Sequence, residues 1–289
     1  MPSIKEYDKK LNSLNNTAKM TGTMKLVSMS KLYRAHESQK KAKSYAHKLT
    51  DMIQRLAASV ESASHPLLKP RTPARKALIL IISSDKGLCG SFNNSLIKGV
   101  RKWLAEQKKN YEKIDLSFCG KRGYMALRHE GELCQNYEGI GANPHFDGAT
   151  KIGKDISRDF VSGKYDEIYL TYNIFNSPLS QHPTFKKIIP IEGETLVKGG
   201  TKLSSAYIFE PPQEELLNFL IPKYLYFRIY FALLENSAGE HGARMTAMDS
   251  ASKNAADMID RCTLLRNRAR QAAITKELIE IVSGAEALK

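Results

Sequence analysis

The chain has 289 residues, of which 42% are hydrophobic and 26% charged, and its formal net charge is +14. This length suffices for one large domain or two smaller ones. No apolar run approaches the roughly 20 residues that a membrane-spanning helix needs, and the first residues lack the apolar core of a signal peptide. Together these features exclude a membrane-spanning chain and predict a soluble, cytoplasmic protein.

The N-terminal segment carries an apolar repeat of 3.5 residues from Ile4 to Val60. Thirteen of the 17 repeat positions are apolar, and the polar exceptions are Thr21, Lys25, Ser28 and Gln39. A repeat sustained over so many heptads is typical of a coiled-coil helix. We therefore predict such a helix within residues 1–62, followed by a proline-rich linker over residues 63–75.

The same segment is strongly basic. Residues 1–60 hold 12 Lys and Arg against 4 Asp and Glu. This excess of positive charge predicts an acidic partner. The partner could be nucleic acid, an anionic membrane or an acidic protein surface, and the charge alone does not choose among them.

Strands and helices are predicted to alternate over residues 76–209. The run ALILIISS is typical of a strand buried on both faces, and further strands are predicted at IDLSFCG, DEIYLTYNIF, FKKIIPI and SSAYIFE. Helices are predicted at SLIKGVRKWLAEQ, KRGYMALRHE and GATKIGKDISRDFVSG. This alternation implies a small, Rossmann-like parallel sheet with helices on both faces.

A second long helix is predicted within residues 210–289, beginning at Pro222, because proline suits the first turn of a helix. Its apolar seam shifts phase between Ala238 and Met248, where the segment SAGEHGARM holds two glycines. Neither long helix can bury its apolar stripe alone. The predicted fold is therefore α/β: a long antiparallel two-helix coiled coil formed by the N- and C-terminal helices, with an inserted Rossmann-like βαβ domain.

No motif for catalysis, a cofactor or a metal ion stands out. The turn SSDKGLCGSFNNS follows the first strand as a dinucleotide-binding turn would, but it holds GxxG rather than GxGxxG, and the sequence has no GxxxxGK[ST] loop. Asp85 and Lys86 in this turn could be active-site groups, although we favour a helix cap. The histidines and the four cysteines match no metal-ligand spacing. We expect no catalytic residue, no cofactor and no metal.

Two functions compete with a structural role on the residues alone. A nucleotide-dependent enzyme would use the βαβ domain, but it would need the phosphate loop that the sequence lacks. A basic coiled-coil nucleic-acid-binding protein would use residues 1–60, but this segment lacks interleaved aromatic residues and a recognised binding motif.

Three segments resemble the gamma subunits of F-type ATP synthases. The segment TAKMTGTMKLV matches the T-x-K-[IM]-T-x-x-M-x-[LM]-V run of the family's N-terminal helix, and SSDKGLCGSFN is similar to its S-D-[RK]-G-L-C-G-x-[FL]-N turn. The third segment, from ARMTAM to RQAAITKELIEIVSGA, resembles the family's long C-terminal signature. The likeness extends over the whole chain.

The resemblance implies a non-catalytic central-stalk rotor, present in one copy at the cytoplasmic face of the bacterial plasma membrane. The terminal helices would lie inside a collar of alpha and beta subunits, with ATP chemistry on beta. The foot would contact the epsilon subunit and the membrane c-ring, and no nucleic acid would bind. Ion-driven rotation of the ring would thereby be coupled to ATP synthesis or hydrolysis.

The resemblance also implies where the chain contacts the collar. The expected contact residues are Met24, Lys25, Arg244, Gln271, Thr275 and Glu280. Arg244 is expected to carry an exposed charge that meets the Met24 region of the opposing helix or an acidic loop of beta, so that its loss hardly alters assembly. The chain departs from the family pattern at Gly22, Asp249, Arg266 and Lys276, and these departures bear on local contacts with neighbouring subunits.

Overall fold

The computed structural model describes residues 3–57, 65–191, 210 and 212–286. Contacts between residues divide the chain into two compact units. The first unit combines the residues up to Ser28 with those from Met245 onward, and the second spans Met29–Arg244. Two long helices, α1 (Ile4–Ala57) and α6 (Gln213–Glu286), each contribute to both units.

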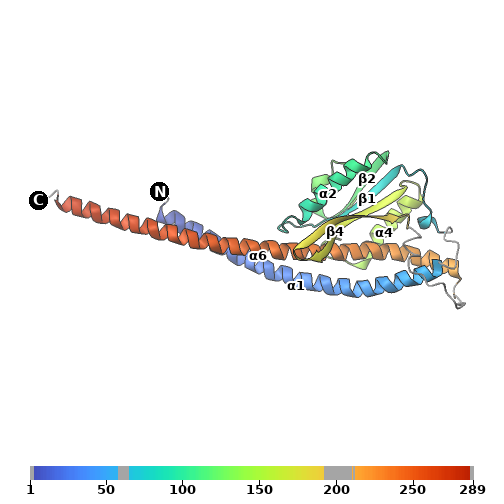
Figure 1. The fold of residues 1–289 in the computed structure, drawn as a ribbon, viewed down its shortest axis with the longest axis horizontal. Helices are drawn as coiled ribbons and strands as arrows, with labels where there is room; N and C mark the ends of the chain where they lie inside the picture. Colours follow the sequence, from blue (N-terminus) through green and yellow to red (C-terminus); the bar gives the residue numbers. More distant parts are fainter. Residues whose placement is uncertain (1–2, 58–64, 192–209, 211, 287–289) are drawn as a thin grey trace. The chain divides into compact units, whose positions relative to one another are not determined.

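In the first unit α1 and α6 run antiparallel. Lys25 on α1 pairs with Asp249 on α6 at 2.6 Å, and Asp8 pairs with Arg266 at 3.5 Å. Residues nearer the N-terminus of α1 therefore pair with residues nearer the C-terminus of α6. Figure 1 shows the C-terminal part of α6 continuing past the N-terminal end of α1. The long antiparallel helix pair that the heptad pattern predicted is confirmed.

Two polar positions in the seam of α1 are hydrogen-bonded without breaking the helix. Thr21 and Ser28 are buried, and their hydroxyls donate to the carbonyls of Thr17 and Met24 at 3.0 and 2.7 Å. An unsatisfied buried hydroxyl would cost about 1–3 kcal/mol. These bonds back to the preceding turn let polar residues occupy an apolar repeat.

The second unit is built on a five-stranded sheet of order β3-β2-β1-β4-β5. The strands are β1 (Lys76–Ile82), β2 (Lys113–Cys119), β3 (Glu132–Tyr137), β4 (Glu167–Ser177) and β5 (Ser180–Ile189). β1 pairs in parallel with β2 and β4, and β2 with β3, whereas β4 and β5 form an antiparallel hairpin. The predicted Rossmann-like insertion is thus present, with one antiparallel edge strand.

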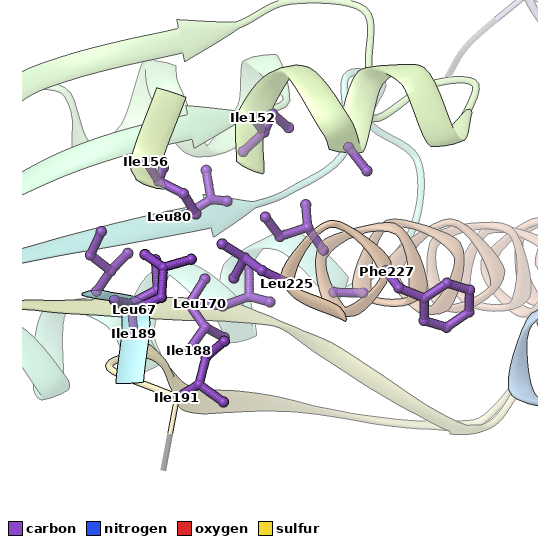
Figure 2. Packing of buried hydrophobic residues seen from close by; sticks show 14 of the residues in the cluster. Leu67, Leu80, Ile152, Ile156, Leu170, Ile188, Ile189, Ile191, Leu225 and Phe227 are labelled. Atoms are coloured by element: carbon purple, nitrogen blue, oxygen red, sulfur yellow. The ribbon is translucent and has the colours of Figure 1, made fainter. Parts of the chain in front are cut away.

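Helices cover both faces of this sheet. Ile79 and Ile81 of β1 pack toward α2 (Phe92–Gln107) and α3 (Lys121–Leu127), whereas Leu80 and its same-face neighbours pack toward α4 (Phe146–Val161) and α6. This division follows from the period of two along a strand. Figure 2 shows Leu80 beside Ile156 of α4 in the larger cluster, to which α6 adds Leu225 and the short 3-10 helix η1 (Pro66–Leu68) adds Leu67.

Three local predictions need correction or comment. Strand β3 was not predicted, because its apolar and polar residues hardly alternate and its Leu133 is exposed. Helix α6 begins at Gln213, so Pro222 lies inside it. Proline removes one helical hydrogen bond there, and burial of the neighbouring Ile221 and Leu225 offsets this loss. The predicted strand SSAYIFE lies, except for Glu210, outside the described residues.

Candidate functional site

The six predicted contact residues occupy two different environments. Met24 and Lys25 lie on α1 in the first unit, and Arg244 lies on α6 in the second. The other three are exposed residues near the C-terminal end of α6: Gln271, Thr275 and Glu280. Their described bonds run along the helix, since the Thr275 hydroxyl donates to the carbonyl of Gln271 at 2.9 Å and Glu280 pairs with Lys276 at 3.5 Å. Their outer faces are therefore available to a partner.

The end of α6 displays large apolar side chains to solvent. Those exposed by 49–68% are Ile274, Leu278, Ile279, Ile281 and Val282. They lie where α6 has run past α1 (Figure 1), and nothing within the described residues of this unit covers them. Contiguous exposed apolar surface of this kind marks an interaction site.

Arg244 is buried, and this corrects the expectation of an exposed charge. The residue is 7% exposed. Its Nη2 donates to Glu240 Oε1 at 2.6 Å, and its Nε and Nη2 donate to the carbonyl oxygen of Gly87 at 3.2 and 3.1 Å. Nη2 also lies 3.4 Å from the carbonyl oxygen of Lys86, and Nη1 lies 3.2 Å from His241 Nδ1. The guanidinium therefore ties α6 to the turn after β1.

The turn after β1 is strained at its tip and fixed on both sides. Leu88 has a φ of 63°, which costs a residue with a Cβ about 1–2 kcal/mol, yet its side chain is 62% exposed. Arg244 holds the two carbonyls that precede it, and the amide of Asn93 donates to Ser84 Oγ at 2.7 Å. The fold thus displays Leu88 in a defined position.

Asp85 in the same turn is a cap, as the sequence analysis favoured, but on another helix. Its Oδ1 accepts from the backbone N–H of Lys121, at the start of α3, at 2.9 Å. Helix α2, the next helix after Asp85 in the chain, has no side-chain cap from its own N-cap residue Ser91. Asp85 therefore links two neighbouring strand-to-helix turns.

Burial shapes the charges around Arg244. Burial raises the pKa of Glu240, and the field of Arg244 opposes that rise. Burial, followed by the positive charges of Arg244 and Lys31, lowers the pKa of His241 from 6.5 to about 4. Because Arg244 can only donate, His241 accepts with Nδ1 and is neutral at physiological pH. Arg244 is thus the cation that pairs directly with the buried carboxyl group of Glu240.

Two glycines let the inserted domain approach α6 closely. A Cβ at Gly239 would lie 2.9 Å from the ring of Phe92, and one at Gly242 would lie 3.1 Å from the ring of Phe175 and 3.2 Å from Pro178 Cα. Helix α6 is continuous through both positions. The interrupted seam in SAGEHGARM therefore marks the place where α2 and the β4–β5 hairpin pack against the helix.

Three of the four departures from the family pattern have ionic partners within the first unit. Asp249 pairs with Lys25 at 2.6 Å and with Lys253 at 2.9 Å, and these two hydrogen bonds lower its pKa from 3.8 to about 2. Arg266 pairs with Asp8, and Lys276 pairs with Glu280. The fourth, Gly22, has open space around the position of a Cβ. Asp249 and Arg266 thus join α1 to α6.

The described residues hold no candidate metal centre. No group of three or more His, Cys, Asp or Glu side chains is placed among them to hold a metal ion. All four cysteines are free thiols, with Cys134 partly exposed and the others buried. In the described part of the chain, no helix combines the length and the apolar character that crossing a membrane requires.

Comparison with known proteins agrees with this arrangement. The family model described as ATP synthase matches residues 3–288. The ATP synthase gamma chain of Geobacter metallireducens is 42% identical over 289 residues, with 100% of both chains covered. That of Cytophaga hutchinsonii is 40% identical, covering 100% of this chain and 99% of the relative.

Solved structures show the same fold. A chain of the central stalk and c-ring structure of Tetrahymena thermophila mitochondrial ATP synthase is 27% identical with a TM-score of 0.59, covering 81% of this chain and 99% of that one. A chain of the Euglena gracilis mitochondrial enzyme reaches a TM-score of 0.67 at 17% identity, covering 99% and 94%, which supports the fold alone. The chain therefore belongs to the ATP synthase gamma chain family, the non-catalytic rotor subunits of F-type ATP synthases.

Proposed function

We propose that this chain turns inside a collar of alpha and beta subunits and couples ion-driven rotation of a membrane c-ring to ATP synthesis or hydrolysis on beta. The observation that carries this proposal is the uncovered apolar end of α6 (residues 274–282), because exposed apolar surface of this kind marks an interaction site. We further propose one copy per complex at the cytoplasmic face of a bacterial plasma membrane, with an epsilon subunit bound to the foot. One asymmetric helix pair presents a different face to each site around it, and different contacts favour different site conformations.

The six contact residues divide into three groups with different proposed roles. Gln271, Thr275 and Glu280 act directly, because their side chains are exposed beside the apolar end of α6. Met24 and Lys25 contact the collar from the side of α1, and the Lys25–Asp249 ion pair holds this part of α1 against α6. Arg244 is a positioning residue: it holds the turn from which Leu88 projects toward a partner.

Reconstitution with alpha, beta and c-ring partners in membrane vesicles tests the direct contacts. Leu278→Asp and Ile281→Asp change side chains that are 57% and 68% exposed, so the isolated chain should fold normally. In the complex they should reduce stoichiometric assembly and ATP-driven ion pumping. The matched control is Leu179→Asp, which makes the same change from an apolar to a charged side chain at an 83% exposed residue of the β4–β5 hairpin. Normal assembly and pumping in both α6 variants would refute the collar as the partner of this end.

The ratio of ion pumping to ATP hydrolysis tests the role of Arg244. Leu88→Ala removes the displayed side chain and leaves the Arg244 bonds in place, whereas Arg244→Lys removes the fork that holds the turn. If Arg244 acts by positioning Leu88, both variants should lower the pumping ratio, and Leu88→Ala should do so without loss of stability. An unchanged ratio in Leu88→Ala would contradict this role.

A further inference from the structure

A pocket in the second unit lies between α1, α6 and the β4–β5 hairpin, away from the Arg244 cluster. Its volume is about 250 Å³. Its apolar walls come from α1, from strand β4 and from a run of aromatic residues on α6; they are Ala46, Leu170, Tyr224, Phe227 and Phe231. Leu170 and Phe227 are labelled in Figure 2. No role proposed above uses this pocket.

Three cations line the same pocket: Lys43, Lys186 and Arg228. The Lys186 ammonium donates to the Tyr172 hydroxyl at 3.1 Å and lies 5.4 Å from the centroid of that ring. The guanidinium of Arg228 lies 5.7 Å from the centroid of the Tyr224 ring. Among the residues that the structure describes, none of the three cations forms a salt bridge within 4.0 Å.

The charges around the pocket do not balance. Burial lowers the pKa of Lys186 and the nearby Arg228 lowers it further, whereas Glu235 acts in the opposite direction. Glu235 is the carboxyl group whose field reaches Lys43 and Lys186, and burial raises its pKa. Among the described residues, the carboxyl group of Glu235 thus acts on two of these three cations, and an anion placed among the cations would relieve their mutual repulsion.

We propose that this pocket binds a small organic anion, a phosphate or carboxylate group carried on a flat apolar body. The cations would hold the anionic group through charge-assisted hydrogen bonds, and the aromatic rings of α6 would pack against the body. The pocket is smaller than the roughly 300–1,000 Å³ of drug-sized sites. This favours a ligand with one ring and one anionic group over a nucleoside triphosphate.

Calorimetric titration of the full-length chain tests the proposal with four probes: phenyl phosphate, benzoate, benzyl alcohol and inorganic phosphate. We expect one equivalent of an aromatic anion to bind, with the neutral alcohol and inorganic phosphate at least tenfold weaker. The comparison of phenyl phosphate with benzoate identifies the anionic group. Lys186→Gln and Arg228→Gln should each weaken binding at least tenfold. The control is Lys223→Gln, a lysine of α6 that lies 3.8 Å from the Phe219 ring and outside the pocket; it should change the affinity less than twofold.

A second measurement needs no substitution and so does not depend on the folding of a variant. Reductive methylation of the unmodified chain should be at least threefold slower at Lys186 when the aromatic anion is present, and unchanged at Lys223. Absence of binding by both aromatic anions, or equal methylation of Lys186 with and without them, would overturn the proposal. Equal affinity in the wild-type, Lys186→Gln and Arg228→Gln chains would also overturn it.

Discussion

Replacing Arg244 with alanine removes a buried guanidinium from a buried carboxyl group and two backbone carbonyls. The side chains of Arg244 and Glu240 are each 9% exposed, and their charged atoms lie 2.6 Å apart. The variant leaves Glu240 without its counter-charge in a place that solvent hardly reaches. Removal of one partner from a buried pair costs roughly 3–5 kcal/mol, and we expect the free energy of unfolding to fall by that amount.

Urea unfolding of the full chain, followed by circular dichroism, measures this loss. The control is Arg266→Ala, because Arg266 pairs with Asp8 at 3.5 Å with a side chain that is 36% exposed; an exposed pair is worth about 0–1 kcal/mol. The double variant Arg244→Ala/Glu240→Gln should be more stable than Arg244→Ala alone, since the buried charge is then gone. A loss below about 1 kcal/mol in Arg244→Ala, or no recovery in the double variant, would refute the reasoning.

Three further outcomes are expected from single sites. The pKa of His241 is lowered from 6.5 to about 4, so His241 takes up a proton at a higher pH in the unfolded chain than in the folded one. The free energy of unfolding should therefore decrease as the pH is lowered from 6.5 to about 4, by up to about 1.4 kcal/mol per pH unit. His241→Gln should flatten that slope in urea titrations at several pH values, and an unchanged slope would assign it to other groups. Gly22→Ala should raise the free energy of unfolding by about 1 kcal/mol, because a Cβ there meets open space; a lower urea midpoint would contradict this. Asp249→Lys should lower the urea midpoint by opposing Lys25, and Lys25→Asp added to it should restore the midpoint; no restoration would show that the 2.6 Å pair does not join the helices in solution.

The elements with strong periodicity could be predicted from the sequence. The 3.5-residue repeat indicated α1, and the long apolar run indicated β1. Each pattern follows directly from which faces of the element are buried. Strand β3 gave little signal, since it is half exposed and its apolar residues hardly alternate. Pro222 was wrongly predicted to start the helix. The local preference of proline for the first turn does not report the tertiary packing that keeps α6 helical on both sides of Pro222.

The environment of Arg244 was beyond sequence reasoning. The expectation of an exposed charge at Arg244 came with the resemblance, whereas the carbonyls of its partners Lys86 and Gly87 lie 158 and 157 residues away in the chain. The glycines at 239 and 242 were a usable signal, because a helix that contains two glycines three residues apart often admits a close neighbour. The expectation that Gln271, Thr275 and Glu280 contact the collar came from the resemblance to the gamma subunits, and all three side chains are exposed.

The antiparallel pairing of α1 and α6 has a consequence for synthesis of the chain. Lys25 and its partner Asp249 are 224 residues apart, and α1 leaves the ribosome first. At about 5–20 residues per second, the partner helix follows on the order of 10–45 seconds later. Throughout that interval the apolar stripe of α1 has no helix to cover it, and the nascent chain is open to aggregation and to binding by chaperones. Helix α6, the last helix to be made, thus ends this exposure.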